Sequence, residues 1–351
     1  MHLNNLQSFL NSLNLFPEFS PNIRKFVIHP ILFANTFSKI DTSYMCRWQN
    51  LSFVVCPQVT FDMDTLVHLS RMRGLTQLEF TLSTATLPLV ASESPLAFLN
   101  LHDFTLHSES LEQISRFISQ IRLPAITGLG AVMGICPSKR ELSSFCSSVQ
   151  ASNTGHTIER LRLDQLPYPQ NNIHSEAFSL CLEDLRPFMT FNLRRLTLDI
   201  EWNVGLMDSE LLVLAFAWPN LEKLYINVER GWSTLDGITP NGLLELLQAC
   251  RSLSKIGLAI DTRGYTECRE LPASLGLTLP PISDIHVPDS MIEVGSMPAV
   301  AAFFTGLMSS SMFYFSAWSG GKMIRRQGRA IYKDRWDMVY KRAREAVSLC
   351  S

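Results

Sequence analysis

The side chains that most often carry out catalysis or bind metals are scattered along this sequence. The eight histidines and eight cysteines form no C-x-x-C pair, and no histidine stands at metal-ligand spacing from a cysteine or carboxylate. His102 and Asp103 adjoin, but neighbours on a strand point to opposite faces. The segment SGGKM at 319–323 resembles a phosphate-binding loop but lacks the upstream glycine and the Ser or Thr after the lysine. We therefore expect no enzyme activity, no metal site and no cofactor.

Composition narrows the classes of partner. The chain has 351 residues, of which 18% are charged, and a formal net charge of −2, so it lacks the basic excess of a nucleic-acid-binding protein. The first residues place Leu3, Leu6 and Leu10 on one face, which predicts an amphipathic helix or cap over 1–20 and not a signal peptide. The cysteines are then expected to be reduced thiols in the cytoplasm or the nucleus.

One stretch could reach across a membrane. Residues 295–321 carry no charge, and four basic residues follow between 322 and 329. Pro298 and the serines at 309–311 interrupt this run, which favours a short helix over 299–308 followed by an aromatic strand over 312–318. Contact with a membrane is not the expected mode, but a membrane-attached scaffold remains an alternative.

A nine-residue pattern recurs along the chain. NLRRLTLDI (192–200), NLEKLYINV (220–228) and SLSKIGLAI (252–260) each place two residues between a first and a second apolar position and then alternate. Further copies occupy 157–165, 281–289, 74–82 and 95–103, a weaker copy occupies 22–30, and the poorest occupies 125–133. A spacing of about 30 residues with this core is typical of leucine-rich repeats.

The pattern predicts the architecture. Each copy forms a short strand whose apolar residues point inward, and stacked strands need helical crossovers to run parallel. We expect an α/β fold, an irregular leucine-rich-repeat solenoid over 21–318 with a parallel concave sheet and helices on the convex side. Helices are expected after the caps at Asp208-Ser209 and Thr239-Pro240, and over 110–121 and 176–185. Residues 319–351 are expected to form a linker and a capping helix with Trp336 and Val339 on its buried stripe.

Candidate binding residues lie at the outward strand positions. The third position of four copies is basic, and the fifth adds further polar or aromatic groups; together they give Arg160, Arg195, Lys223 and Lys255, then Arg162, Thr197 and Tyr225. Strands about 4.8 Å apart would hold the basic groups close enough to repel one another. Two interpretations stay open: the concave face binds an acidic protein, or nearby carboxylates such as Glu222 and Asp199 neutralise an incidental row. Trp232 is a further aromatic candidate beside Tyr225.

The segment AWPNLEKLYIN (217–227) with GWSTLDGITPNGLLELLQACRSLSKIGLAID (231–261) resembles the repeat region of fungal F-box/leucine-rich-repeat proteins. The resemblance implies a substrate-recognition part of a cullin-type ubiquitin ligase. An F-box would bind a Skp-type adaptor, but its Leu-Pro-x-Glu opening is not found in this sequence, where LFPEF at 15–19 is a faint counterpart. We expect adaptor binding only if an F-box lies upstream. An orphan repeat protein without a ligase link is the alternative.

Overall fold

Short parallel strands stacked in chain order form the centre of this fold. The computed structural model describes residues 22–28, 42–83, 95–153, 157–166, 179–232, 237–267, 279–308, 314–319 and 328–350. Eleven strands join one sheet in the order β1-β2-β3-β5-β7-β8-β10-β12-β13-β14-β15. The registers of β1 to β7 and of β10 to β15 are parallel, which confirms the expected α/β repeat architecture. The chain divides into two compact units, 1–158 with 162–169 and 159–161 with 170–351.

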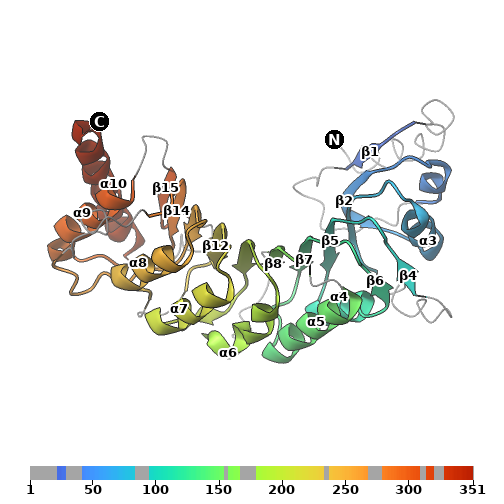
Figure 1. Ribbon diagram of the computed structural model, residues 1–351, viewed down its shortest axis with the longest axis horizontal. Helices are drawn as coiled ribbons and strands as arrows, with labels where there is room; N and C mark the ends of the chain where they lie inside the picture. Colours follow the sequence, from blue (N-terminus) through green and yellow to red (C-terminus); the bar gives the residue numbers. More distant parts are fainter. Residues whose placement is uncertain are drawn as a thin grey trace. The chain divides into compact units, whose positions relative to one another are not determined.

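The first unit alternates strands with short helices. Figure 1 shows α4 and α5 side by side beneath the strands β5 and β7. Its elements are β1 (Lys25–Val27), η1 (Ser43–Arg47), β2 (Phe53–Thr60), α3 (Met63–Arg71), β3 (Gln77–Thr81), β4 (Leu96–Ala97), β5 (Asp103–Ser108), α4 (Leu111–Ile118), β6 (Ile121–Arg122), β7 (Gly128–Met133), α5 (Lys139–Ser152) and most of β8 (Arg160–Gln165).

One repeat of the first unit lies five residues later than the sequence predicts. The expected strand over 95–103 is wrong, because 96–97 form only the two-residue strand β4, which pairs with β6 outside the main sheet. The main sheet uses 103–108 instead. The same apolar spacing fits there, with Leu101, Phe104 and Leu106 all fully or almost fully buried. The sequence pattern matches two overlapping segments here, so it does not decide which of them forms the strand.

The second unit repeats the strand–helix alternation. Figure 1 shows α7, α8 and α9 along one side of its strands. Its elements are β9 (Ser179–Leu180), α6 (Leu182–Leu185), η3 (Arg186–Thr190), β10 (Arg195–Asp199), β11 (Asn203–Val204), α7 (Asp208–Ala217), β12 (Lys223–Ile226), α8 (Pro240–Ala249), β13 (Lys255–Gly257), β14 (Asp284–Val287), η5 (Val294–Ser296), α9 (Met297–Leu307), β15 (Tyr314–Ala317) and α10 (Arg329–Cys350).

The crossovers follow their capping residues, with two differences. Thr239 caps α8 by accepting a hydrogen bond from the amide of Gly242, as expected. Asp208 is instead the first residue of α7, and its carboxylate accepts bonds from the amide and hydroxyl of Thr239. The helix expected over 176–185 is wrong for its described residues: 179–180 form β9, and only the single turn of α6 follows. The helix expected over 1–20 lies outside the described residues.

The terminal helix covers the apolar edge of the last coil. Trp336, Val339 and Ala343 of α10 are fully buried, and α10 packs against α9 and β15. The indole N–H groups of Trp318 and Trp336 donate to one acceptor, the carbonyl of Ser290, at 2.7 and 2.9 Å. This helix therefore closes the hydrophobic interior at the end of the second unit.

The uncharged stretch near the C-terminal end folds into two short elements. The described parts of 295–321 form the eleven-residue helix α9 and the strand β15, close to the helix and strand expected there. Across the described residues, no helix combines the length and the apolar character needed to span a bilayer.

Replacing Trp336 tests the capping role of α10. We expect Trp336→Ala to lower the free energy of unfolding by about 3–5 kcal/mol, because a fully buried indole and its hydrogen bond are lost. Urea denaturation measures this change. The control is Met338→Ala in the same helix, where the side chain is 48% exposed and the expected change is about 0.5 kcal/mol or less. Equal effects at both positions would contradict the assignment.

Candidate functional site: the outward face of the second unit

Three cations stand in register on neighbouring strands of the second unit. Arg195 of β10 lies opposite Lys223 of β12, which lies opposite Lys255 of β13. We call Arg195, Lys223 and Lys255 the basic row. Arg195 and Lys255 are exposed and Lys223 is half-buried, so all three reach the outward side of the sheet. The inward neighbours Leu196, Leu224 and Ile256 are fully or almost fully buried, which fixes this orientation.

Carboxylates flank the basic row. Glu222 contacts Arg195, with 3.1 Å between Nε and Oε2, and also forms an ion pair with Arg194. Hydrogen bonds from these arginines, Arg194 first, hold the pKa of Glu222 below its ordinary value. Lys255 stands in register with Asp284 of β14. Of the carboxylates named for the second interpretation, Glu222 therefore pairs with Arg195.

The remaining predicted residues divide between the two units. Arg160 and Thr197 lie with the basic row in the second unit; the amide of Arg195 donates to the carbonyl of Glu159, and Thr197 stands opposite Tyr225. Arg162 belongs to the first unit and forms an ion pair with Asp164.

A glycine lets Tyr225 reach across one strand to another. Tyr225 stands in register with Gly257 of β13, and Gly257 with His286 of β14. A Cβ atom at Gly257 would lie 2.3 Å from Val228 Cγ2 and 3.1 Å from Tyr225 Cδ1. Because this space is left open, the Tyr225 hydroxyl donates a 2.6 Å hydrogen bond to Asp284, which lies 59 residues further along the chain.

Three rings line up on this face. The centroids of Tyr225 and His286 are 5.1 Å apart with an edge-to-face orientation, and those of His286 and Tyr314 are 5.5 Å apart. We call Tyr225, His286 and Tyr314 the aromatic row. Such spacings are typical of favourable aromatic pairs. Lys223 places its ammonium 4.0 Å from the centroid of the Tyr225 ring, so the basic and aromatic rows are in direct contact.

Asp284 contacts two members of the aromatic row, Tyr225 and His286. His286 Nε2 lies 3.1 Å from Asp284 Oδ1, an ion-pair distance, while Asp284 Oδ2 accepts the Tyr225 bond. Burial acts to raise the pKa of Asp284, but the contacts with His286 and Tyr225 and the charge of Lys255 outweigh it, so this pKa lies below its ordinary value. For Tyr225, burial and then the bond to Asp284 raise the pKa well above its usual range.

The indole of Trp232 is not part of this surface. The sequence suggested it as an aromatic candidate beside Tyr225, but its side chain is fully buried. Its N–H donates to the carbonyl of Ile226 at 2.9 Å, and its backbone amide donates to Asp289. Trp232 therefore has a role in packing. The sequence analysis did not identify His286, Asp284 and Tyr314 as candidates. Asp284 is acidic at the third position of its copy and so does not continue the basic row, and Tyr314 lies in the aromatic strand outside the nine-residue copies.

Groups for metal or thiol chemistry are not gathered here. Within the described residues, no three His, Cys, Asp or Glu side chains stand close enough to hold a metal ion. Cys56, Cys146 and Cys250 are buried unpaired thiols, and burial raises their pKa values to about 12, about 12 and about 11. Such thiols are poor nucleophiles because little thiolate forms near neutral pH.

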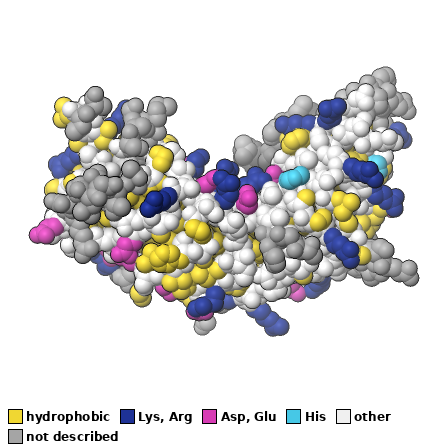
Figure 2. Space-filling model, viewed as in Figure 1, with side chains coloured by type: hydrophobic (Ala, Val, Ile, Leu, Met, Phe, Trp, Pro, Cys, Tyr) yellow, Lys and Arg dark blue, Asp and Glu magenta, His cyan; other side chains and the backbone are white. Residues whose placement is uncertain are grey.

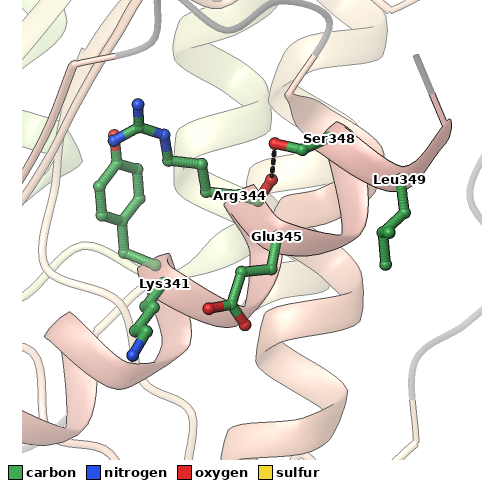
Figure 3. Close-up of a pocket in the computed structure, with 6 residues that line it drawn as sticks. Lys341, Arg344, Glu345, Ser348 and Leu349 are labelled. Atoms are coloured by element: carbon green, nitrogen blue, oxygen red, sulfur yellow. Dashed lines mark hydrogen bonds between the residues drawn. The ribbon is translucent and has the colours of Figure 1, made fainter.

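An open groove runs along the end of α10. Its volume is about 680 Å³, and its lining is formed by Tyr340, Lys341, Arg344, Glu345, Ser348 and Leu349. Figure 3 shows Lys341, Glu345 and Leu349 projecting from successive turns of this helix. The hydroxyl of Ser348 bonds to the backbone carbonyl of Arg344, as expected for a helix-surface serine. This mixture of groups from one helix lacks a buried polar centre.

The helical side carries a separate apolar area. Met207, Val213 and Phe216 are exposed, and Figure 2 shows hydrophobic side chains gathered over the region of α7 and α8. Helix α7 is therefore apolar on its outer side as well as its buried side. Polar groups are few there, and we place the candidate site on the outward face of the strands.

Comparisons with known proteins give likeness in structure only. No protein-family model matches the chain, and no curated protein matches it in sequence. A structure described as the Rad7 and Elc1 complex in yeast is similar over 85% of this chain and 80% of that chain, at 12% identity and a TM-score of 0.41. The leucine-rich repeat-containing protein LegL7 from Legionella pneumophila covers 86% and 95%, at 11% identity and a TM-score of 0.32. The fold assignment therefore rests on the strand order and the repeat described above.

Filling the space at Gly257 tests how Tyr225 is positioned. We expect Gly257→Ala to cost about 1–3 kcal/mol of unfolding free energy, because the added methyl meets Val228 and the Tyr225 ring. Adding Val228→Ala should recover part of this loss by removing the closer contact. The control is Gly295→Ala, where nothing lies within 4 Å of the added Cβ. A Gly257→Ala protein as stable as wild type would contradict the geometry.

The ion pairing of Asp284 predicts a pH dependence. Its folded-state pKa is below the unfolded value, so its contribution to stability is present above about pH 4 and is lost as pH falls through the lower, folded pKa. We expect Asp284→Asn to be less stable than wild type at pH 6 and to show a shallower loss between pH 4 and pH 2. Urea denaturation at fixed pH values measures both curves. Parallel curves for the two proteins would contradict the expectation.

Proposed function

We propose that this chain is a non-catalytic protein-binding module and that the basic row of the second unit binds an acidic segment of its partner. The observation that carries the proposal is the register of Arg195, Lys223 and Lys255 on three adjacent strands. The fold gains nothing from placing like charges about 4.8 Å apart, and such contacts are usually unfavourable. Binding of an anionic segment would remove this repulsion.

Each carboxylate near the basic row also contacts residues outside the row. Glu222 contacts both Arg194 and Arg195, and Asp284 contacts His286 and Tyr225 as well as standing beside Lys255. Positive groups therefore outnumber the carboxylates at the strand positions of the basic row. A partner carboxylate would add charge-assisted bonds to groups that remain exposed.

A protein segment suits this surface better than a nucleic acid. Nucleic-acid binding relies on many phosphate contacts from a strongly basic surface, whereas this chain has a net charge of −2 and carries Glu222 and Asp284 beside the row. A short acidic segment can place its charges on the row and avoid these carboxylates. The adjoining aromatic row also offers apolar area, which is characteristic of protein interfaces.

We propose further that the module serves as the substrate-recognition part of a cullin-type ubiquitin ligase in the cytoplasm or the nucleus. The support is the sequence resemblance of 217–227 and 231–261 to fungal F-box/leucine-rich-repeat proteins. Affinity purification of the tagged full-length protein from its own cells tests this role. Co-purification of a Skp-type adaptor and a cullin is expected; purification of the protein without either one would overturn the ligase role and leave the binding module unaffected.

Neutralising the row tests the binding module itself. The probe is a fluorescein-labelled twelve-residue peptide rich in Asp and Glu, followed by fluorescence anisotropy. We expect Arg195→Gln with Lys255→Gln to weaken binding roughly two- to thirty-fold, because each lost charge contributes about 0.2–1 kcal/mol at an exposed site. The affinity of the wild-type chain should also fall as salt rises.

Three comparisons make this experiment decisive. Arg251→Gln, at an exposed position after α8, is the charge-matched control and should leave binding unchanged. The same peptide with Asn and Gln in place of its acids should not bind. Thermal unfolding of the double variant should match wild type. If the double variant binds the acidic peptide as well as wild type, or if an oligothymidylate of equal charge binds more tightly, the proposal is wrong.

A further inference from the structure

We propose that the aromatic row binds a second group of the partner. This group is an aromatic or aliphatic side chain about three residues from the acidic group that binds the basic row. This inference rests on the proposed function and specifies the partner segment. Its basis is the position of one exposed ring. Tyr314 is 59% exposed and lies on β15, two strands away from Lys255.

The ring of Tyr314 packs against a ring on the neighbouring strand. It contacts His286, which contacts Tyr225, and the Tyr225 hydroxyl is already bonded to Asp284. The inner part of the aromatic row is therefore held in place and offers ring surface for packing. Rigid, partly exposed aromatic groups of this kind are common anchors in protein interfaces because few rotamers are lost when they bind.

The strand spacing sets the distance between the two contacts. Lys255, Asp284 and Tyr314 stand opposite one another on consecutive strands. Two steps of about 4.8 Å separate Lys255 from Tyr314 by about 10 Å. An extended segment crossing the strands advances about 3.3 Å per residue, so about three residues span this distance.

Asp284 restricts what can lie between the two contacts. It occupies the middle strand of the three, beside Lys255 on one side and Tyr314 on the other. Its carboxylate repels a second acidic residue placed over it. The partner segment therefore needs its acidic group over the basic row, a neutral residue over Asp284, and its apolar group over Tyr314.

A set of designed peptides tests this arrangement on the full chain. Each labelled peptide has three adjacent glutamates in a Gly/Ser background. The first carries Phe three positions after the glutamates, the second carries Phe three positions before them, and the third has Ser in place of Phe. We expect one or both Phe peptides to bind about three- to ten-fold more tightly than the Ser peptide. Moving Phe next to the glutamates should remove most of the gain.

Two variants test which residue produces the higher affinity of the Phe peptides. Tyr314→Ala should abolish the difference between the Phe and Ser peptides while leaving the affinity for the Ser peptide unchanged. Phe216→Ala, at a 72% exposed ring on α7, is the matched control and should keep the difference. A gain that survives Tyr314→Ala, or no gain for either order of residues, would overturn the inference.

The outcomes separate this inference from the proposed function. If the Ser peptide binds and is weakened by Arg195→Gln with Lys255→Gln while Phe adds nothing, only the role of the aromatic row fails. If the Phe peptides bind through Tyr314 but ignore those two substitutions, the aromatic row is supported and the acidic contact fails. If no peptide binds, both proposals are wrong.

Discussion

Each strand of the second unit depends on its neighbours to bury its inward side chains. Leu196, Leu224 and Ile256 stand in register and are fully or almost fully buried, and Ile285 continues the same row. Strands of three to five residues are too short to do this alone, so burial and strand order are inseparable. Because packing determines every second residue, the alternate outward residues are available for other roles. The candidate binding residues of this chain therefore lie on that outward side.

The candidate site lies where the outward side chains differ in size from one strand to the next. Gly257 removes one side chain from the middle of the face, and Tyr225 crosses the space to reach Asp284. This bond joins β12 to β14 past the intervening strand. It also orients Tyr225 beneath the ammonium of Lys223, so that a positive charge and an aromatic surface are held together. A single glycine thus links the electrostatic and the apolar parts of the surface.

The sequence predicted the fold well where the repeat is regular. The strands β8, β10, β12, β13 and β14 all lie within the nine-residue copies identified from the sequence, and the outward orientation of the basic row follows from alternation. The prediction from sequence was wrong at 95–103, where two matches to the pattern overlap. It was also wrong at 176–185, where the apolar residues do not form a continuous helix. The contact between Tyr225 and Asp284 could not be read from the sequence, because coil lengths vary and only the register brings these residues together. Alternation also gave no reason to expect that Trp232, just beyond its strand, turns inward.

The shared acceptor at Ser290 has a consequence for how the chain opens. One carbonyl receives the indole N–H groups of Trp318, just after β15, and Trp336 in α10. The two segments also pack together directly, because Trp318 stacks on Tyr332 and Phe315 stacks on Tyr340. The final strand and the helix that follows should consequently detach in one cooperative step, where an unanchored end would fray gradually.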